Sequence, residues 1–253
     1  MSAPGWLVAK PVAHRGLHDR LLGVIENSCA AALAAIAAKC SIECDVQMSR
    51  DGEAFVFHDE TLERLTAAQG RLDALDARDV ARVQLSGCAE RIPSLSDFLA
   101  CVAGRTPLVI EIKSAFNGDM RLAERTASLV AQANGPIALK SFDPAIMAHL
   151  RAHRARLGLM QTPLGMVSEA RFEPAEYPEI DAETRLNLRH FLHWPQTRPE
   201  FLSYCVHDLP HAVPHLLREA LGVPVMAWTV RTPHDWAQAA LWADQAIFEG
   251  PVG

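Results

Sequence analysis

Short apolar runs alternate with longer helix-like stretches along almost the whole of this 253-residue chain. The apolar runs predict strands at residues 11–13, 41–47, 108–112, 137–142, 157–162, 203–206, 224–230 and 245–249. The segments between them predict helices opened by Asn27 or Ser28, by Ser94 or Ser96 and by Pro144, and others at about 119–133, 211–220 and 233–243. Such even alternation over this length favours a closed α/β barrel of parallel strands over a doubly wound sheet.

Two stretches follow this alternation less clearly. Residues 60–97 are rich in charge and predict helix, and residues 163–200 carry five prolines and predict irregular structure. The chain contains no linker, internal repeat or low-complexity tract, so we expect a single domain over residues 1–253.

Acidic residues occupy a strand that a barrel would bury. Residues 41–59 read SIECDVQMSRDGEAFVFHD, and apolar positions 42, 44 and 46 alternate with polar positions 43, 45 and 47. Asp51-Gly52 predicts a turn, and Phe55 and Phe57 would continue the apolar face on the returning strand. A solvated outer face is the ordinary meaning of such alternation, but related charge on other strands makes it the weaker interpretation here.

The length of the turn decides which carboxylate meets His58. With a loop of two residues, Asp45 would face His58 across the hairpin; with a loop of four, Glu43 would face it. A loop of three residues would break this arrangement. Either even register gathers two carboxylates and a histidine on one face.

Composition excludes several classes of function. Lys and Arg total 24 and Asp and Glu total 30, so the net charge of −6 argues against non-specific binding to nucleic acid or to an anionic membrane. An anionic substrate remains compatible with this charge, because a metal or a local arginine can reverse the field in a cleft. We expect no signal peptide, no membrane span and six reduced cysteines, and therefore a cytoplasmic protein.

Three carboxylates on predicted strands indicate a metal site. Glu43 and Asp45 lie on one strand, and Glu111 lies on LVIEI at 108–112. In a parallel barrel the carboxyl ends of the strands meet at one mouth. Three hard oxygen ligands suit Mg²⁺, Ca²⁺ or Mn²⁺ rather than zinc, and burying three carboxylates without a cation would be costly. A single such carboxylate would more often be paired with an arginine or lysine at a rim.

Four further residues complete a candidate active site at the same mouth. His14 follows the first predicted strand, and together with His58 it offers a general acid and a general base. Arg15 and Lys113 could hold an anion, because the arginine fork matches phosphate oxygens and lysine provides a point charge. This combination is suited to cleaving a phosphate ester.

These motifs together resemble the glycerophosphodiester phosphodiesterase family. The matching elements occur in family order and span nearly the whole chain: HRG at 14–16, EN at 26–27, IECDVQ at 42–47, DG at 51–52, FVFHDETLERLT at 55–66, IPSL at 92–95, IEIK at 110–113, SF at 141–142 and WTV at 228–230.

The resemblance implies a TIM (β/α)8 barrel that hydrolyses glycerophosphodiesters to glycerol 3-phosphate and an alcohol. It matches Glu43, Asp45 and Glu111 to divalent-metal ligands, His14 and His58 to an acid–base pair, and Arg15 and Lys113 to phosphate-contacting positions. Residues from about 60 to 92 correspond to a small insertion after the second histidine. The expected partner is a small-molecule substrate, with no nucleic acid and no integral membrane association.

Some positions depart from the family pattern, and others have more than one interpretation. Arg231 stands where the family often has Asn, and Glu249 stands where it usually has Asp, which affects substrate preference more than the reaction. Trp228 is either a wall of the glycerol site or part of the core, and Lys140 could help to bind phosphate. A lysophospholipase D-like activity on lysolipids is the alternative function; a catalytically silent phosphate-binding barrel is disfavoured because every site residue is present.

Overall fold

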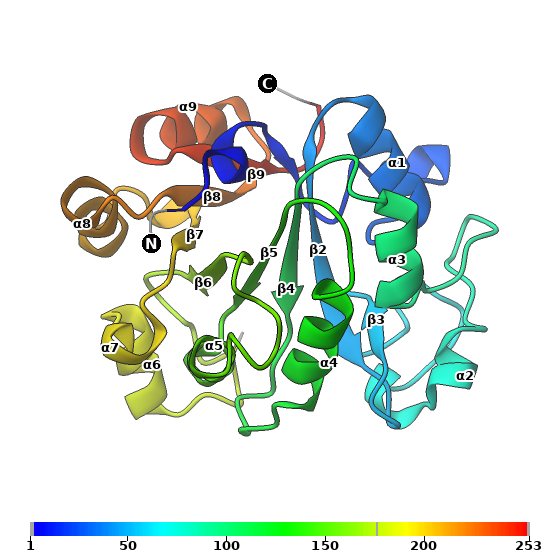
Figure 1. Ribbon diagram of the computed structural model, residues 1–253. Helices are drawn as coiled ribbons and strands as arrows, with labels where there is room; N and C mark the ends of the chain where they lie inside the picture. Colours follow the sequence, from blue (N-terminus) through cyan, green and yellow to red (C-terminus); the bar gives the residue numbers. More distant parts are fainter. Residues whose placement is uncertain (1–2, 176, 252–253) are drawn as a thin grey trace.

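The structure is a computed structural model that describes residues 3–175 and 177–251, and a closed barrel organises it (Figure 1). Within these ranges eight parallel strands pair in the order β1-β9-β8-β7-β6-β5-β4-β2, and β1 pairs with β2 to close the ring. The strands of the ring are β1 (Val12–Ala13), β2 (Ser41–Met48), β4 (Leu108–Ile112), β5 (Ile137–Ser141), β6 (Leu164–Ser168), β7 (Phe201–Cys205), β8 (Val225–Val230) and β9 (Gln245–Phe248). The predicted parallel α/β barrel is confirmed.

Helices surround the strands, as the barrel requires (Figure 1). They are α1 (Cys29–Ala37), α2 (Ala77–Val80), α3 (Leu95–Val102), α4 (Arg121–Val130), α5 (Pro144–Ala152), α6 (Ala182–Arg189), α7 (Trp194–Thr197), α8 (Ala212–Leu221) and α9 (Pro233–Trp242). The predicted starts at Ser28 and Ser94 are confirmed, because each side-chain hydroxyl accepts a hydrogen bond from a backbone N–H three residues on. No helix within the described ranges has both the length and the apolar character needed to cross a bilayer.

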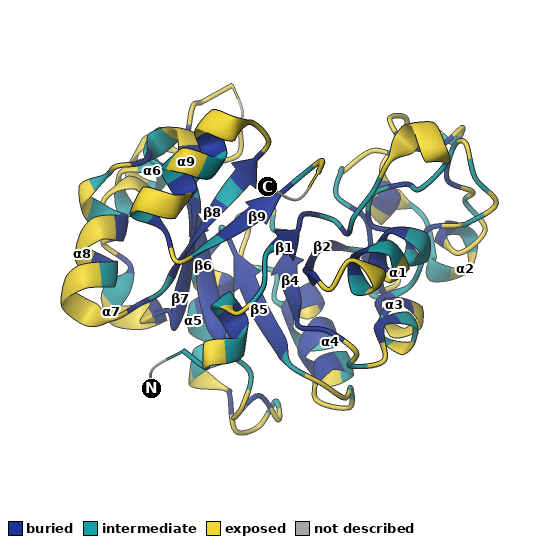
Figure 2. Ribbon diagram, turned by 90° about the horizontal axis from the view of Figure 1, so that it is seen from above, coloured by how far each residue is buried: buried dark blue, intermediate teal, exposed yellow. Residues whose placement is uncertain are grey.

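The barrel packs on both of its faces. Figure 2 shows the strands almost wholly in the colour of buried residues, while the outer faces of the helices are exposed. Inside the ring, Phe201 fills the space beside Gly165, where a Cβ would lie 2.4 Å from the phenyl ring. The interior below the mouth is thus a filled core, as in other barrels of this size.

The segment after the second histidine forms a small unit of its own. Residues 60–97 were predicted to be helical, but before α3 begins at Leu95 their only regular helices among the described residues are α2 and a 3₁₀ turn at Leu72–Ala74. The segment lies beside β3 (Ala54–Val56) in Figure 1 and packs on a separate apolar cluster with Ile25, Phe55 and Phe57. The helix prediction was wrong because the apolar side chains of this segment belong to loops, and they pack on this cluster instead of forming one face of a helix.

Two other predictions were also wrong. Residues 157–162 are turns rather than a strand, and the fifth strand of the ring is β6 at Leu164–Ser168, inside the stretch predicted to be irregular. Leu157 and Leu159 are apolar because they pack against the main core, and Pro163 precedes the strand rather than interrupting it. Helix α6 also lies within the stretch predicted to be irregular.

The hairpin has the odd register that was predicted to break the site. Val46 pairs with Val56 and Met48 with Ala54, and the backbone N–H of Ser49 donates to Glu53, which leaves a loop of three residues. Phe55 therefore lies opposite Gln47 and packs on the separate cluster rather than on the main core. The predicted facing of His58 with Asp45 or Glu43 across the ladder is wrong.

Candidate active site at the carboxyl ends of the strands

The strand register of the barrel brings the acidic residues together at one mouth. Asp45 on β2 pairs with Glu111 on β4, and Glu111 pairs with Lys140 on β5. Glu43 lies two residues before Asp45 and therefore on the same inner face. The predicted convergence of the three carboxylates thus follows from the closure of the barrel.

The three carboxylates form a buried cluster that fits a divalent cation. One oxygen of each of Glu43, Asp45 and Glu111 lies within 4.8 Å of the others, and the three residues are at most 5% exposed. Glu43 Oε1 and Asp45 Oδ1 are buried, and each has a lysine ammonium group 2.9 Å away. Three converging carboxylates are the oxygen ligands that a hard divalent cation takes.

Basic side chains offset the charge of this cluster. Lys113 Nζ lies 2.5 Å from Glu111 Oε1 and 2.9 Å from Asp45 Oδ1. Lys140 is 2% exposed, and its Nζ lies 2.9 Å from Glu43 Oε1 and 3.3 Å from Glu111 Oε2. Burial opposes the charge on Asp45, but Lys113, the histidines and an arginine outweigh it and hold the pKa of this carboxyl well below its usual range.

Each of the two histidines is held by a carboxylate through Nδ1. His14 Nδ1 lies 2.6 Å from Glu249 Oε1, and His58 Nδ1 lies 2.7 Å from Asp59 Oδ1. On the other side of its ring, His14 Nε2 lies 3.8 Å from Glu43 Oε2. His58 lies two residues beyond the end of β3, and its backbone carbonyl accepts a hydrogen bond from the side chain of Gln47 on β2.

Arg15 contacts the carboxylate cluster and a second network. Its Nε lies 3.3 Å from Asp45 Oδ2, and its Nη1 donates to Glu26 Oε1 at 2.6 Å. Arg64 binds the same Glu26 with two hydrogen bonds and also donates to Asp59. Burial would raise the pKa of Glu26, but these arginines lower it to about 2. A continuous chain of contacts therefore joins Arg15 to the carboxylate that holds His58.

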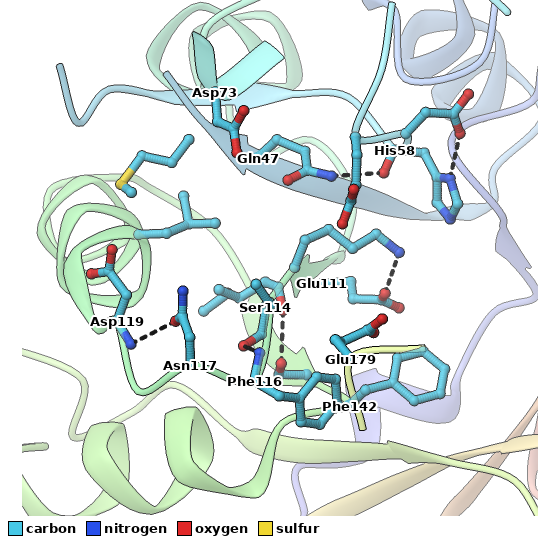
Figure 3. Close-up of a pocket in the computed structure, with 18 of the residues that line it drawn as sticks. Gln47, His58, Asp73, Glu111, Ser114, Phe116, Asn117, Asp119, Phe142 and Glu179 are labelled. Carbon is cyan, nitrogen blue, oxygen red and sulfur yellow. Dashed lines mark hydrogen bonds and ion pairs between the residues drawn. The ribbon is translucent and has the colours of Figure 1, made fainter. Parts of the chain in front are cut away.

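A cavity of about 790 Å³ opens beside the cluster. His58, Glu111 and Lys113 border it, whereas Glu43 and Asp45 are buried more deeply in the barrel. Figure 3 shows His58 above, Phe116 and Phe142 below, and Glu111 between them. Its polar side next to an aromatic side suits a ligand with an anionic centre and a less polar remainder.

Trp228 borders this cavity at the end of β8. Its ring meets that of Phe142 edge to face, with 5.6 Å between the centroids. Its indole Nε1 is buried without a hydrogen-bond partner among the described residues. Trp228 therefore fits both interpretations given for it, because it packs on Phe142 and also borders the cavity.

The structure brings every residue predicted for the site to this mouth. It adds side chains that the sequence did not single out for the histidines, namely Glu249, Asp59, Arg64 and Glu26, and it gives Lys140 carboxylate partners. Glu249 and His14 are 235 positions apart in the sequence, so only the closure of the barrel reveals their contact. The positions of Glu249 and His14, each directly after a strand, were the available signal.

Comparison with known proteins places this arrangement in a family. Residues 14–249 match the Glycerophosphoryl diester phosphodiesterase family. A probable glycerophosphodiester phosphodiesterase 2 of Mycobacterium tuberculosis is 38% identical over 85 residues, which are 33% of this chain and 32% of that protein. A glycerophosphodiester phosphodiesterase of Caldanaerobacter subterraneus is 33% identical over 111 residues, 41% of this chain and 44% of that protein. The matched segments thus span less than half the length of these two curated relatives.

Solved structures share the fold over nearly the whole chain. A phosphodiesterase of Oleispira antarctica, solved with the product sn-glycerol-3-phosphate, superposes with a TM-score of 0.74 at 19% identity and covers 96% of this chain and 93% of its own. A glycerophosphodiester phosphodiesterase of Thermotoga maritima has a TM-score of 0.69 at 21% identity and covers 94% of each chain. At this identity the likeness concerns the fold, which is a TIM barrel.

Proposed function

This chain belongs to the glycerophosphoryl diester phosphodiesterase family, and from that membership we propose that it hydrolyses glycerophosphodiesters to glycerol 3-phosphate and an alcohol. The observation that carries the proposal is the buried cluster of Glu43, Asp45 and Glu111 with a histidine on each side of the site. The bound product named for the Oleispira antarctica protein supports the same substrate class.

Glu43, Asp45 and Glu111 would hold one divalent cation, Mg²⁺ or Ca²⁺, with Mn²⁺ also suited to these ligands. When bound, the cation would neutralise the charge that develops on the phosphate oxygens during hydrolysis. The convergence of one oxygen from each buried carboxylate within 4.8 Å supports this assignment, because a divalent cation would offset their mutual repulsion.

Arg15 and Lys113 orient the phosphate in this proposal. Both already lie within ion-pair distance of Asp45 at the edge of the cluster. A diester phosphate placed at the cluster would therefore meet a guanidinium and an ammonium, and fixed positive groups of this kind both position the substrate and stabilise its transition state.

His14 and His58 carry out the proton transfers. One removes a proton from the attacking nucleophile, and the other donates a proton to the oxygen of the departing alcohol. The contacts of Nδ1 with Glu249 and Asp59 support these roles, because they leave Nε2 of each ring for exchange with the substrate.

The aromatic side of the cavity would receive the organic part of the substrate. Trp228 and Phe142 meet edge to face there, and Phe116 and Tyr177 border the same space. Trp228 is thus a substrate-binding residue in this proposal. Phe116 adds to this aromatic wall, which could also receive part of an acyl chain. We therefore keep a lysophospholipase D-like activity as the second candidate.

The test is release of glycerol 3-phosphate from glycerophosphocholine and glycerophosphoethanolamine, with EDTA and then with Mg²⁺, Mn²⁺ or Ca²⁺ restored. A lysophosphatidylcholine arm separates the two candidates. Release from the soluble diesters that EDTA abolishes and a cation restores is the expected result. Release from the lysolipid alone would replace the first candidate by the second, and no release from any substrate would refute both.

Charge and cysteine state complete the proposal. All six cysteines are free, which supports a location in the reducing cytoplasm, and the negative net charge supports a small-molecule partner rather than nucleic acid. The whole chain would act as one domain, with residues from about 60 to 92 as its small insertion.

A further inference from the structure

Three residues that directly follow neighbouring strands lie in one row at the mouth. Val230 of β8 pairs with Phe248 of β9, and Phe248 pairs with Ala13 of β1. The next residues along the chain, Arg231, Glu249 and His14, therefore come to the same level on adjacent strands. Backbone hydrogen bonds fix this level, since the N–H of His14 donates to Phe248 and the N–H of Glu249 donates to Val230.

The side chains of this row are bonded in series. Arg231 Nε donates to Glu249 Oε2 at 2.8 Å, and Arg231 Nη2 donates to Glu249 Oε1 at 3.1 Å. Glu249 Oε1 in turn accepts from His14 Nδ1 at 2.6 Å. Arg231 and Glu249 are the two positions at which the sequence departs from the family pattern near its end, and the structure shows that they contact each other and a histidine of the site.

We propose that Glu249, held by Arg231, is a positioning residue that fixes the ring of His14 with Nε2 directed at the carboxylate cluster. This inference rests on the proposed function for its effect on turnover, but the ring orientation itself is a property of the chain. Figure 3 shows the equivalent contact at His58, whose ring is bonded to the neighbouring carboxylate.

The charge and burial of Glu249 suit it to this role. Its side chain is 20% exposed and that of His14 is 10% exposed, so little water competes for the contact. Burial opposes the charged form of Glu249, but the hydrogen bonds from His14 and Arg231 outweigh it and lower the pKa of this carboxyl well below its usual range. An ionised carboxylate can only accept a hydrogen bond, so the proton of a neutral His14 ring stays on Nδ1.

In the neutral ring of His14, Nε2 is therefore the nitrogen without a proton. It lies 3.8 Å from Glu43 Oε2, on the side of the ring that faces the cluster. If His14 is the base, Nε2 takes up a proton from the nucleophile, and the ring becomes a cation with Glu249 already on its other side. If His14 is the acid, the cationic ring gives a proton from Nε2 to the leaving oxygen and becomes the neutral ring with its proton on Nδ1. His58 carries out the other transfer, so one proton is taken up and one is given up in each turnover.

The decisive variant is Glu249→Gln, which keeps the size of the side chain and removes its charge. A glutamine can donate to Nδ1 as well as accept from it, so the ring is no longer confined to one tautomer. We expect kcat to fall at least ~30-fold with KM changed less than about threefold, because loss of the orienting carboxylate in a serine-protease triad costs about 10⁴-fold in turnover. Arg231→Gln leaves the carboxylate of Glu249 in place, and the side chain of Arg231 is half exposed. This variant should therefore lower kcat less than Glu249→Gln does.

A double-mutant cycle separates positioning from a structural role. If Glu249 acts only through His14, then Glu249→Gln should change kcat less than about twofold when His14 is already alanine. Glu53→Gln is the matched control, because Glu53 also binds an arginine, Arg125, with two hydrogen bonds but is not one of the residues that border the cavity. It should leave kcat within about twofold of the unchanged chain.

A second readout does not depend on activity. In the full chain labelled with ¹⁵N in its histidine rings, the His14 signals, assigned by His14→Gln, report which nitrogen carries the proton. Where the spectrum shows the ring to be neutral, the unchanged chain should have protonated Nδ1 and bare Nε2, and Glu249→Gln should lose this pattern.

The outcomes are distinguishable. A Glu249→Gln chain that keeps the Nδ1-protonated ring, or that loses the same factor of kcat with and without His14, overturns the positioning role. An unchanged chain that hydrolyses no diester refutes the proposed function, and the ring spectrum then still decides the orientation.

Discussion

Replacing the buried lysine of the carboxylate cluster gives the sharpest test of how this site balances its charge. Lys140 is 2% exposed and lies 2.9 Å from Glu43 Oε1 and 3.3 Å from Glu111 Oε2. Lys140→Met keeps most of the volume of the side chain and removes its charge. The two carboxylates would then remain buried with one fewer cation beside them.

The magnitude follows from these two distances. At an effective dielectric constant of about 20, the contacts contribute roughly 6 and 5 kcal/mol of Coulomb attraction, most of which the desolvation of the three groups cancels. Removing one partner of a buried ion pair typically costs about 3–5 kcal/mol. We expect about 3 kcal/mol for Lys140→Met, because Lys113 still faces Glu111 and a carboxyl can take up a proton.

The assay is thermal unfolding followed by circular dichroism, with EDTA and with a saturating divalent cation. In EDTA the variant should unfold about 6–12 °C below the unchanged chain, at roughly 2–4 °C per kcal/mol for a protein of this size. A cation at about 100 times its Kd adds about 2.7 kcal/mol of stability. This gain should be larger in the variant, because the cation no longer competes with the ammonium for Glu43 and Glu111.

The exposed Lys39 provides the control, since Lys39→Met changes the net charge equally without touching the cluster. It should move the melting temperature by less than about 2 °C in either condition. An equal cation-induced rise in Lys140→Met and in the unchanged chain would refute the reasoning, as would a variant that melts within about 1 °C of the unchanged chain in EDTA.

Three further predictions concern catalysis, pH and packing. His14→Ala and His58→Ala should each lower kcat at least ~100-fold with the fold intact, measured by product release and circular dichroism. Glu26 has its pKa lowered from 4.5 to about 2, so its contribution to stability is present above pH 4.5 and is lost as the pH falls towards 2. Glu26→Gln should therefore flatten the loss of stability over this window, by up to ~3 kcal/mol in urea unfolding. Gly165→Ala should cost about 1–3 kcal/mol or prevent folding, because the new Cβ would lie 2.4 Å from the ring of Phe201.

Each of these has a control or a contrary outcome. Near-normal turnover of either histidine variant would remove that histidine from the acid–base pair. If stability falls with acid in the same way after Glu26→Gln, then the contacts of Glu26 with its arginine partners do not stabilise the fold. Gly5→Ala is the packing control, because nothing lies within 4 Å of its added Cβ, and equal stability of the two alanine variants would contradict the filled barrel interior.

The sequence predicted the barrel and the convergence of the acidic residues at its mouth because both depend on local pattern. The alternation of residues 41–47 and the two-residue spacing of Glu111 and Lys113 place side chains on one face of a strand whatever its neighbours are. Closing a barrel then brings the strand ends together without further information.

The register of the hairpin could not be predicted from the alternation of apolar and polar residues. Its loop has three residues because Gly52, at φ 94°, closes a turn in which its N–H donates to Ser49. This local backbone geometry cannot be derived from alternation, since a loop longer or shorter by one residue leaves the apolar pattern nearly unchanged. His58 still reaches the mouth, where it borders the cavity.

The contacts that hold the histidines were also out of reach of the sequence. The pairing of His14 with Glu249 joins the first and the last strands, and the pairing of Arg64 with Glu26 joins the insertion to the loop after β1. Such contacts follow from the level at which strands meet and from how loops cross over one another. Strand β6 was missed for a similar reason, because a proline just before a strand resembles one that interrupts it.

We propose above that Glu43, Asp45 and Glu111 hold one divalent cation on which diester hydrolysis depends. The most direct measurement is a Mn²⁺ titration of the EDTA-treated chain, in which bound Mn²⁺ is followed by electron paramagnetic resonance and glycerol 3-phosphate release is followed in the same samples. We expect one tight Mn²⁺ site per chain, with an occupancy that rises together with turnover. Asp45→Asn should lose both the tight site and the turnover. Full turnover without bound cation, or an unchanged tight site in Asp45→Asn, would contradict it.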